Sequence, residues 1–89
     1  MSAVLYALSD PLRLTVVRTL ATKGQHACGE FCLPVAKSTA SHHFRILREA
    51  GVIQMTPQGT QFIISLRKED LNGRFPGLLD AVLRATGTL

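Results

Sequence analysis

Cys28 and Cys32 are the residues whose type and spacing best suit metal or redox chemistry. On a regular helix, residues four positions apart lie on one face, so the two thiols could bind a soft metal or an arsenical, with His26 as a third ligand. They could also form a redox switch, although a regular helix would strain a disulfide between them. A third interpretation, which we favour, is that both are small apolar residues on a buried face.

Two adjacent histidines, His42 and His43, lie in the run KSTASHHFRILREAGVI, residues 37–53. Two helical ligands of one ion usually stand at i and i+4, where their side chains converge, so this pair is poorly placed to share a metal. Neither histidine has a carboxylate or a nucleophile at a recognisable spacing, and no glycine-rich phosphate loop is present. We expect no metal site at this pair, no cofactor and no enzyme.

Length and composition are those of one globular domain spanning residues 1–89, with 46% apolar and 18% charged residues. The formal net charge of +4 favours a polyanion as partner. A membrane span needs about 18 consecutive apolar residues, and the apolar residues 1–8 lack the basic leader and the length of a signal peptide. We therefore expect a cytoplasmic protein with no membrane partner.

The elements that must position these side chains begin with a helix over residues 10–23. Ser9 or Asp10 caps it, Pro11 stands in its first turn and Gly24 ends it. The segment 28–33 has room for a short helix around the two cysteines.

A second helix is predicted from Ala36 or Lys37 to Ala50, with Gly51 in the position of a left-handed cap. Its apolar residues Ala40, Phe44 and Leu47, with Ile46, collect on one side when each residue advances by about 100°. His42 therefore points away from the core, whereas His43 lies at the edge of the core.

Two β-type runs follow, residues 52–56 and 60–66, joined by the three-residue loop 57–59. Such loops commonly end in a glycine with positive φ, so the runs predict a β-hairpin with an exposed tip. A turn of helix broken by Gly73 and a last amphipathic helix over residues 76–86 complete the chain. Two helices followed by a hairpin predict a mainly α fold with a β-hairpin wing (α+β), the winged helix-turn-helix.

The segments ALSDPLRLTVVRTLA (residues 7–21) and KSTASHHFRILREAGVI resemble the opening helix and the recognition helix of the ArsR-type winged-helix repressors. The resemblance implies a dimer that represses its operon and releases DNA on sensing an inducer. It places seven residues in the DNA-reading stretch: Lys37, Ser38, Thr39, Ser41, His42, His43 and Arg45. Hydroxyl, imidazole and guanidinium groups all bond phosphates or base edges.

One residue of that stretch, His42, stands where the family frequently has an arginine. Exchanging a permanent cation for an imidazole should weaken the attraction to phosphate and could make DNA affinity depend on pH. The wing tip, residues 56–61, contains no Lys or Arg. We expect weak polar contacts from it, through Gln58, Thr60 and Gln61 as well as Thr56.

The cysteines depart from the family's metal motif, ELCVCDL or ELCVGDL. Aligning GEF of this chain with GDL puts Ala27 and Gly29 at the thiol positions. No histidine follows His43, so the family's second site, on the final helix, is absent too. The inducer is therefore unidentified, with thiol oxidation or a metal at Cys28 and Cys32 as candidates.

Terminal apolar stripes are expected to need a cover, and we predict that they form a homodimer on double-stranded operator DNA. They comprise Val4, Leu5 and Leu8 at one end, and Leu78, Leu79, Val82 and Leu83 at the other. The alternative from another class is a winged-helix module that binds protein rather than DNA. It predicts little dependence of affinity on salt.

Overall fold

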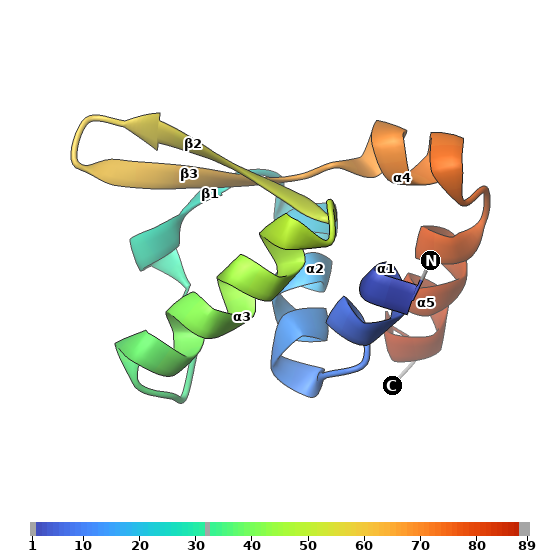
Figure 1. The fold of residues 1–89 in the computed structure, drawn as a ribbon, viewed down its shortest axis with the longest axis horizontal. Helices are drawn as coiled ribbons and strands as arrows, with labels where there is room; N and C mark the ends of the chain where they lie inside the picture. The colour runs from blue at the N-terminus through green and yellow to red at the C-terminus, as the bar shows by residue number, and fades with distance from the viewer. Residues whose placement is uncertain (1, 32, 88–89) are drawn as a thin grey trace.

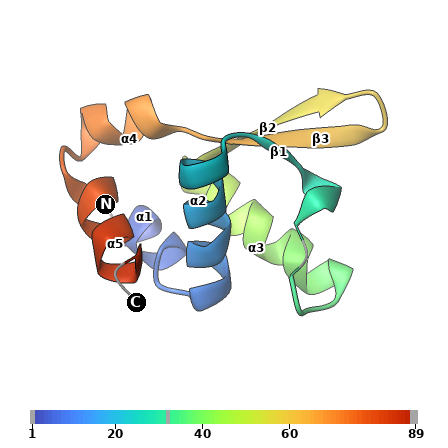
Figure 2. The same ribbon diagram turned by 180° about the vertical axis from the view of Figure 1, so that it is seen from behind.

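The fold, seen in a computed structural model that describes residues 2–31 and 33–87, combines five α-helices with a small sheet (Figure 1). In chain order the elements are α1 (Ser2–Ala7), α2 (Pro11–Lys23), β1 (His26–Ala27), a 3-10 turn (Cys28–Glu30), α3 (Lys37–Glu49), β2 (Ile53–Gln58), β3 (Gln61–Leu66), α4 (Lys68–Arg74) and α5 (Leu78–Gly87). The hairpin β2–β3 projects from the helical body, and α1 and α5 lie at the opposite end of the molecule (Figures 1 and 2). This is the predicted α+β arrangement with a wing.

The sheet is antiparallel, in the order β1-β3-β2. Gln58 pairs with Gln61, so the hairpin loop has the two residues Gly59 and Thr60, and the predicted three-residue loop is wrong. Pro57 lies within β2, which is an edge strand, where a missing N–H is tolerated. The positive φ predicted for Gly59 is confirmed at 63°, as a two-residue hairpin turn requires.

The helix predicted over residues 10–23 is confirmed as α2. The Asp10 carboxylate accepts hydrogen bonds from the backbone N–H groups of Leu12 (2.9 Å) and Arg13 (3.1 Å), and Gly24 ends the helix with a φ of 83°. The second predicted helix is confirmed as α3, and Gly51 follows it with a φ of 80°.

The segment between these two helices differs from the prediction. Residues 26–27 form the short strand β1 on β3, and only Cys28–Glu30 turn as a 3-10 helix. The Glu30 carboxylate accepts a hydrogen bond from the Ala27 N–H at 2.7 Å, and Phe31 is extended. The regular helix predicted over 28–33 is therefore wrong as far as Phe31, and Cys32 lies outside the described residues. Strand pairing and the local cap outweigh helix propensity.

Near the C-terminus, Gly73 lies inside α4 and does not break it. The last helix, α5, begins at Leu78, two residues after the predicted start, because Pro76 and Gly77 form a turn in which Gly77 has a φ of 84°.

The core joins the two terminal helices to α2, α3 and the sheet. Val4 and Leu8 are 2% and 7% exposed, and Leu79 is 2% exposed, so one chain covers these three side chains by itself. The expectation that they need a partner is wrong. Each such side chain contributes about 1.5–3 kcal/mol through burial. Leu5 and Tyr6 on α1 remain exposed, at 48% and 59%.

Candidate nucleic-acid interface

Helix α3 presents a continuous polar face to solvent. Six of the seven residues predicted to read DNA are exposed there: Lys37, Ser38, Thr39, Ser41, His42 and Arg45. The opposite face carries Phe44 and Leu47, which are 4% and 0% exposed, and the Phe31 ring packs edge-on against Phe44 at 5.5 Å between centroids. The predicted division of this helix into two faces is confirmed.

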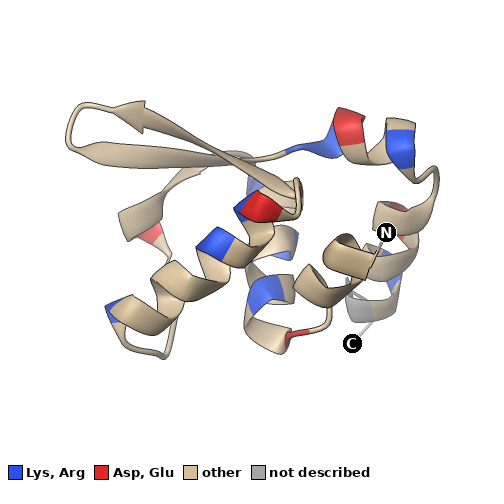
Figure 3. Cartoon of the chain, viewed as in Figure 1, with Lys and Arg blue, Asp and Glu red and all other residues tan. Residues whose placement is uncertain are grey.

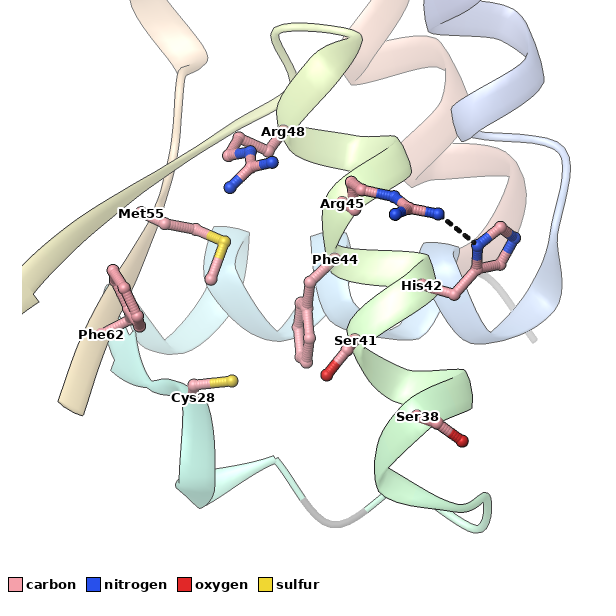
Figure 4. Close-up of a pocket in the computed structure, with 9 residues that line it drawn as sticks. All are labelled: Cys28, Ser38, Ser41, His42, Phe44, Arg45, Arg48, Met55 and Phe62. Carbon is pink, nitrogen blue, oxygen red and sulfur yellow. Dashed lines mark hydrogen bonds between the residues drawn. The ribbon is translucent and has the colours of Figure 1, made fainter. Parts of the chain in front are cut away.

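The exposed imidazole of His42 lies beside Arg45, one turn further along α3. Arg45 Nη2 is 3.4 Å from His42 Nδ1, and since a guanidinium can only donate, the imidazole accepts (Figure 4). The two side chains therefore present one paired polar surface on the outer face.

The seventh residue, His43, is only 8% exposed. Its Nδ1 lies 3.1 Å from Nη1 of the buried Arg13 and 3.9 Å from Oδ2 of Asp10. The adjacent histidines are thus divided between two environments, as the helical wheel predicts. Any contact of His43 with DNA is confined to the side of its ring that Arg13 does not occupy.

A groove of about 400 Å³ lies between α3 and the hairpin (Figure 4). Its apolar lining consists of Cys28, Phe44, Met55 and Phe62, and its polar lining of Ser38, Ser41, His42, Arg45 and Arg48. Sequence reasoning missed Arg48 and Phe62. Arg48 follows Arg45 by three residues and Ser41 by seven, a helical spacing that could have revealed it. Phe62 is 47% exposed on β3, and only the strand pairing brings it opposite α3.

The predicted wing residues Gln58, Thr60 and Gln61 are exposed around the hairpin turn. No acidic or basic residue occurs in β2, the turn or β3, as the uniform tan of the hairpin in Figure 3 shows. The Arg side chains that line the groove, Arg45 and Arg48, both lie on α3.

The surroundings of Cys28 do not favour metal binding. Burial raises the pKa of Cys28, which favours the neutral thiol over the thiolate that binds metals. His26 Nδ1 donates a hydrogen bond to the Gly24 carbonyl at 2.8 Å, which requires the tautomer protonated at that nitrogen. In the parts of the chain that the structure describes, no group of three His, Cys, Asp or Glu side chains could hold a metal ion.

The sequence and the fold both match known regulators. A family model described as a helix-turn-helix domain matches residues 8–56, more than half of the chain. The uncharacterized HTH-type transcriptional regulator YceK of Bacillus subtilis (strain 168) is 39% identical over 80 residues, covering 85% of this chain and 79% of the relative. The chain belongs to the helix-turn-helix transcriptional regulators.

Two solved structures share the fold of this regulator. The transcriptional repressor BigR from Xylella fastidiosa superposes with a TM-score of 0.72 at 26% identity, over 94% of this chain and 83% of BigR. A crystal structure of an ArsR family transcriptional regulator gives a TM-score of 0.73 at 22% identity, over 98% of this chain and 84% of the other. The predicted likeness to ArsR-type regulators, the winged-helix fold and the DNA-binding regulatory function are confirmed. No helix within residues 2–31 and 33–87 has the length and apolar character to cross a membrane.

Proposed function

We propose that this regulator is a sequence-specific repressor, a cytoplasmic homodimer in which α3 of each protomer enters the major groove of operator DNA. The observation that carries the proposal is the outer face of α3, where six polar side chains stand exposed on a helix whose other face is buried. A helix held in this way presents its side chains to base edges at fixed positions.

The contacts divide by chemistry. Lys37 at the start of α3 and Arg45 on its outer face are cations that bond phosphate, and Arg45 also suits guanine. Ser38, Thr39 and Ser41 supply hydroxyls for phosphates or base edges, and His42 reaches outward beside Arg45. Gln58, Thr60 and Gln61 of the wing add weak polar contacts to the DNA backbone or the minor groove.

The dimer would use the end of the molecule opposite the wing. Leu5 and Tyr6 expose apolar surface on α1, and a two-fold partner would cover it while spacing two recognition helices about one DNA turn apart. Analytical ultracentrifugation at micromolar concentration should give the mass of a dimer, and a monomer would contradict this arrangement.

DNA selected from a random pool by the purified protein tests the main proposal. We expect a two-fold symmetric site, bound with an affinity that falls steeply with salt, and repression of a reporter placed behind that site. His42→Ala should lower the affinity, and an unchanged affinity would contradict the contact of this side chain. Binding that shows neither sequence preference nor dependence on salt would point instead to a protein-binding module.

We propose a structural role for Cys28 and Cys32 and no cofactor, with the raised pKa of Cys28 as support. Operator binding measured with reductant, with peroxide, and with Zn²⁺ or arsenite tests this role. Equal affinity in all conditions is expected. Loss of binding with peroxide would indicate a redox switch, and loss with Zn²⁺ or arsenite would indicate a metal or metalloid sensor.

A further inference from the structure

Arg13 of α2 is buried, at 5% exposed, and three of its nitrogens have partners on other elements. Nε donates to the Ala7 carbonyl at 2.8 Å and Nη2 to the Tyr6 carbonyl at 3.0 Å, both at the C-terminal end of α1. The guanidinium carbon also lies 4.9 Å from the centre of the Tyr6 ring, within the range of a cation–π contact. Through these contacts Arg13 joins α2 to α1.

The third partner is His43 on α3, whose Nδ1 is 3.1 Å from Arg13 Nη1. Because a guanidinium has no acceptor, Nδ1 must accept this hydrogen bond and the ring proton must lie on Nε2. The Asp10 carboxylate at 3.9 Å is too distant to compete, and its Oδ2 already accepts two backbone N–H groups. The contact therefore selects one neutral tautomer of His43.

The remaining nitrogen, Nε2, has no partner among the described residues, yet every buried side-chain nitrogen or oxygen within them is hydrogen-bonded. Nε2 must therefore reach solvent at the edge of α3. The other titratable ring that faces His43 is that of His42, whose centroid lies 6.0 Å away. The Nδ1 side of the His43 ring is held by Arg13 inside the fold, and the Nε2 side faces solvent beside the residues predicted to read DNA.

We propose that Arg13 is a positioning residue for the recognition helix, acting through His43. The inference rests on the proposed DNA-reading function. His43 lies two residues after Ser41 and two residues before Arg45, so a rotation of α3 about its axis moves these predicted contacts together. Arg13 opposes that rotation by tying His43 to the end of α1, and a displacement of α1 would reach the reading face through the same bonds.

Two replacements of His43 test the hydrogen bond between Arg13 and His43, called the link below. Asn offers a carbonyl oxygen close to the position of imidazole Nδ1 and can still accept from Arg13, whereas Leu cannot. His43→Leu should lower the affinity for the selected operator about tenfold, as loss of one good base contact does, while the affinity for random DNA and the salt slope stay unchanged. His43→Asn should recover most of the lost preference for the operator.

A stability control separates positioning from folding. Val16→Ala, at a fully buried position of α2, loosens the core without touching the link. At a temperature where all variants are folded, it should retain the wild-type ratio of operator to random-DNA affinity. A ratio lowered equally by Val16→Ala and His43→Leu would overturn the positioning role.

Nitrogen NMR of the His43 ring gives a readout that does not involve DNA. Near neutral pH the spectrum should show an unprotonated Nδ1 and a protonated Nε2, and Arg13→Met should change that pattern. A protonated Nδ1 in the wild type would overturn the link. A wild-type protein without sequence preference would overturn the proposed function and the positioning role together, whereas a normal preference that His43→Leu leaves intact would overturn the positioning role alone.

Discussion

The recognition helix and the wing occupy the same side of the molecule but differ in how they are held and charged. Helix α3 is anchored by Phe44, Leu47 and His43, and carries Lys37, Arg45 and Arg48 on its exposed side. The hairpin has no charged residue, and its turn is exposed throughout. Since phosphate attraction comes from Lys and Arg, we expect the helix to supply most of the proposed affinity for DNA and the wing to make a smaller contribution.

The largest expected effect comes from removing the anchor of the helix. Leu47→Ala empties a site that is 0% exposed and should lower the free energy of unfolding by about 2–5 kcal/mol, a large part of the total for a chain of this size. Urea denaturation measures the loss. Ser41→Ala, on the exposed face of the same helix, should change stability by less than about 0.5 kcal/mol. Equal losses would mean that the helix is not anchored as described.

The second test compares side chains of the helix and the wing directly. Arg45→Ala should weaken operator binding by about 1–3 kcal/mol, because it removes a cation suited to guanine or phosphate. Gln61→Ala removes one neutral contact and should weaken operator binding by at most about 0.5–1.5 kcal/mol, the net contribution of an ordinary hydrogen bond. Fluorescence anisotropy with labelled operator measures both affinities. A larger loss from Gln61→Ala would reverse the assignment of affinity to the helix.

Adding a positive charge to the wing should reduce the difference between the contributions of the helix and the wing to DNA affinity. Gln58→Arg places a cation beside the exposed turn and should raise affinity several-fold at low salt, because each neutralised phosphate adds about 0.9 to the slope of log affinity against log salt. Gln58→Glu is the matched control and should weaken binding. If neither variant changes the salt slope, the wing lies away from the DNA backbone.

The smallest expected effect concerns the start of α2. Desolvation by itself would raise the pKa of Asp10, but the hydrogen bonds from the backbone N–H groups of Arg13 and Leu12, together with the charge of Arg13, keep it below its usual value. A lowered folded-state pKa contributes stability above the carboxyl's unfolded value of about 3.9 and loses it as pH falls through the folded value.

Asp10→Ala should therefore cost about 1 kcal/mol at neutral pH, the typical worth of an N-cap. Asp10→Asn keeps the capping oxygen but cannot titrate, so its stability should fall less than that of the wild type between neutral and strongly acidic pH. Thermal melts over this range measure the difference. Parallel losses in the wild type and in Asp10→Asn would show that the carboxylate charge contributes nothing.

Local patterns were sufficient for α2, α3 and the hairpin, because each has its own signal: a cap and a glycine stop, a helical apolar stripe, or two β-type runs around Gly59. They failed at Cys28–Glu30, where a 3-10 turn directly after the pairing of β1 with β3 replaces the expected regular helix. That pairing joins residues almost forty positions apart, which a local pattern does not contain.

The candidate interface divides in the same way. Helical periodicity placed His42 outside and His43 at the core edge, and a family resemblance placed both in a reading stretch. The groove with Phe62 opposite α3 depends on the register of β3, so sequence reasoning did not find it.

By itself, then, the sequence determined the family, the two-faced recognition helix and an uncharged wing, since these depend on residue type and on short spacing. Tertiary structure alone decided that Val4, Leu8 and Leu79 are covered within one chain. It also decided that Arg13 donates a hydrogen bond to the buried side of the His43 ring. Arg13 and His43 are thirty residues apart, and only the packing of α1, α2 and α3 brings a guanidinium within hydrogen-bond distance of the imidazole.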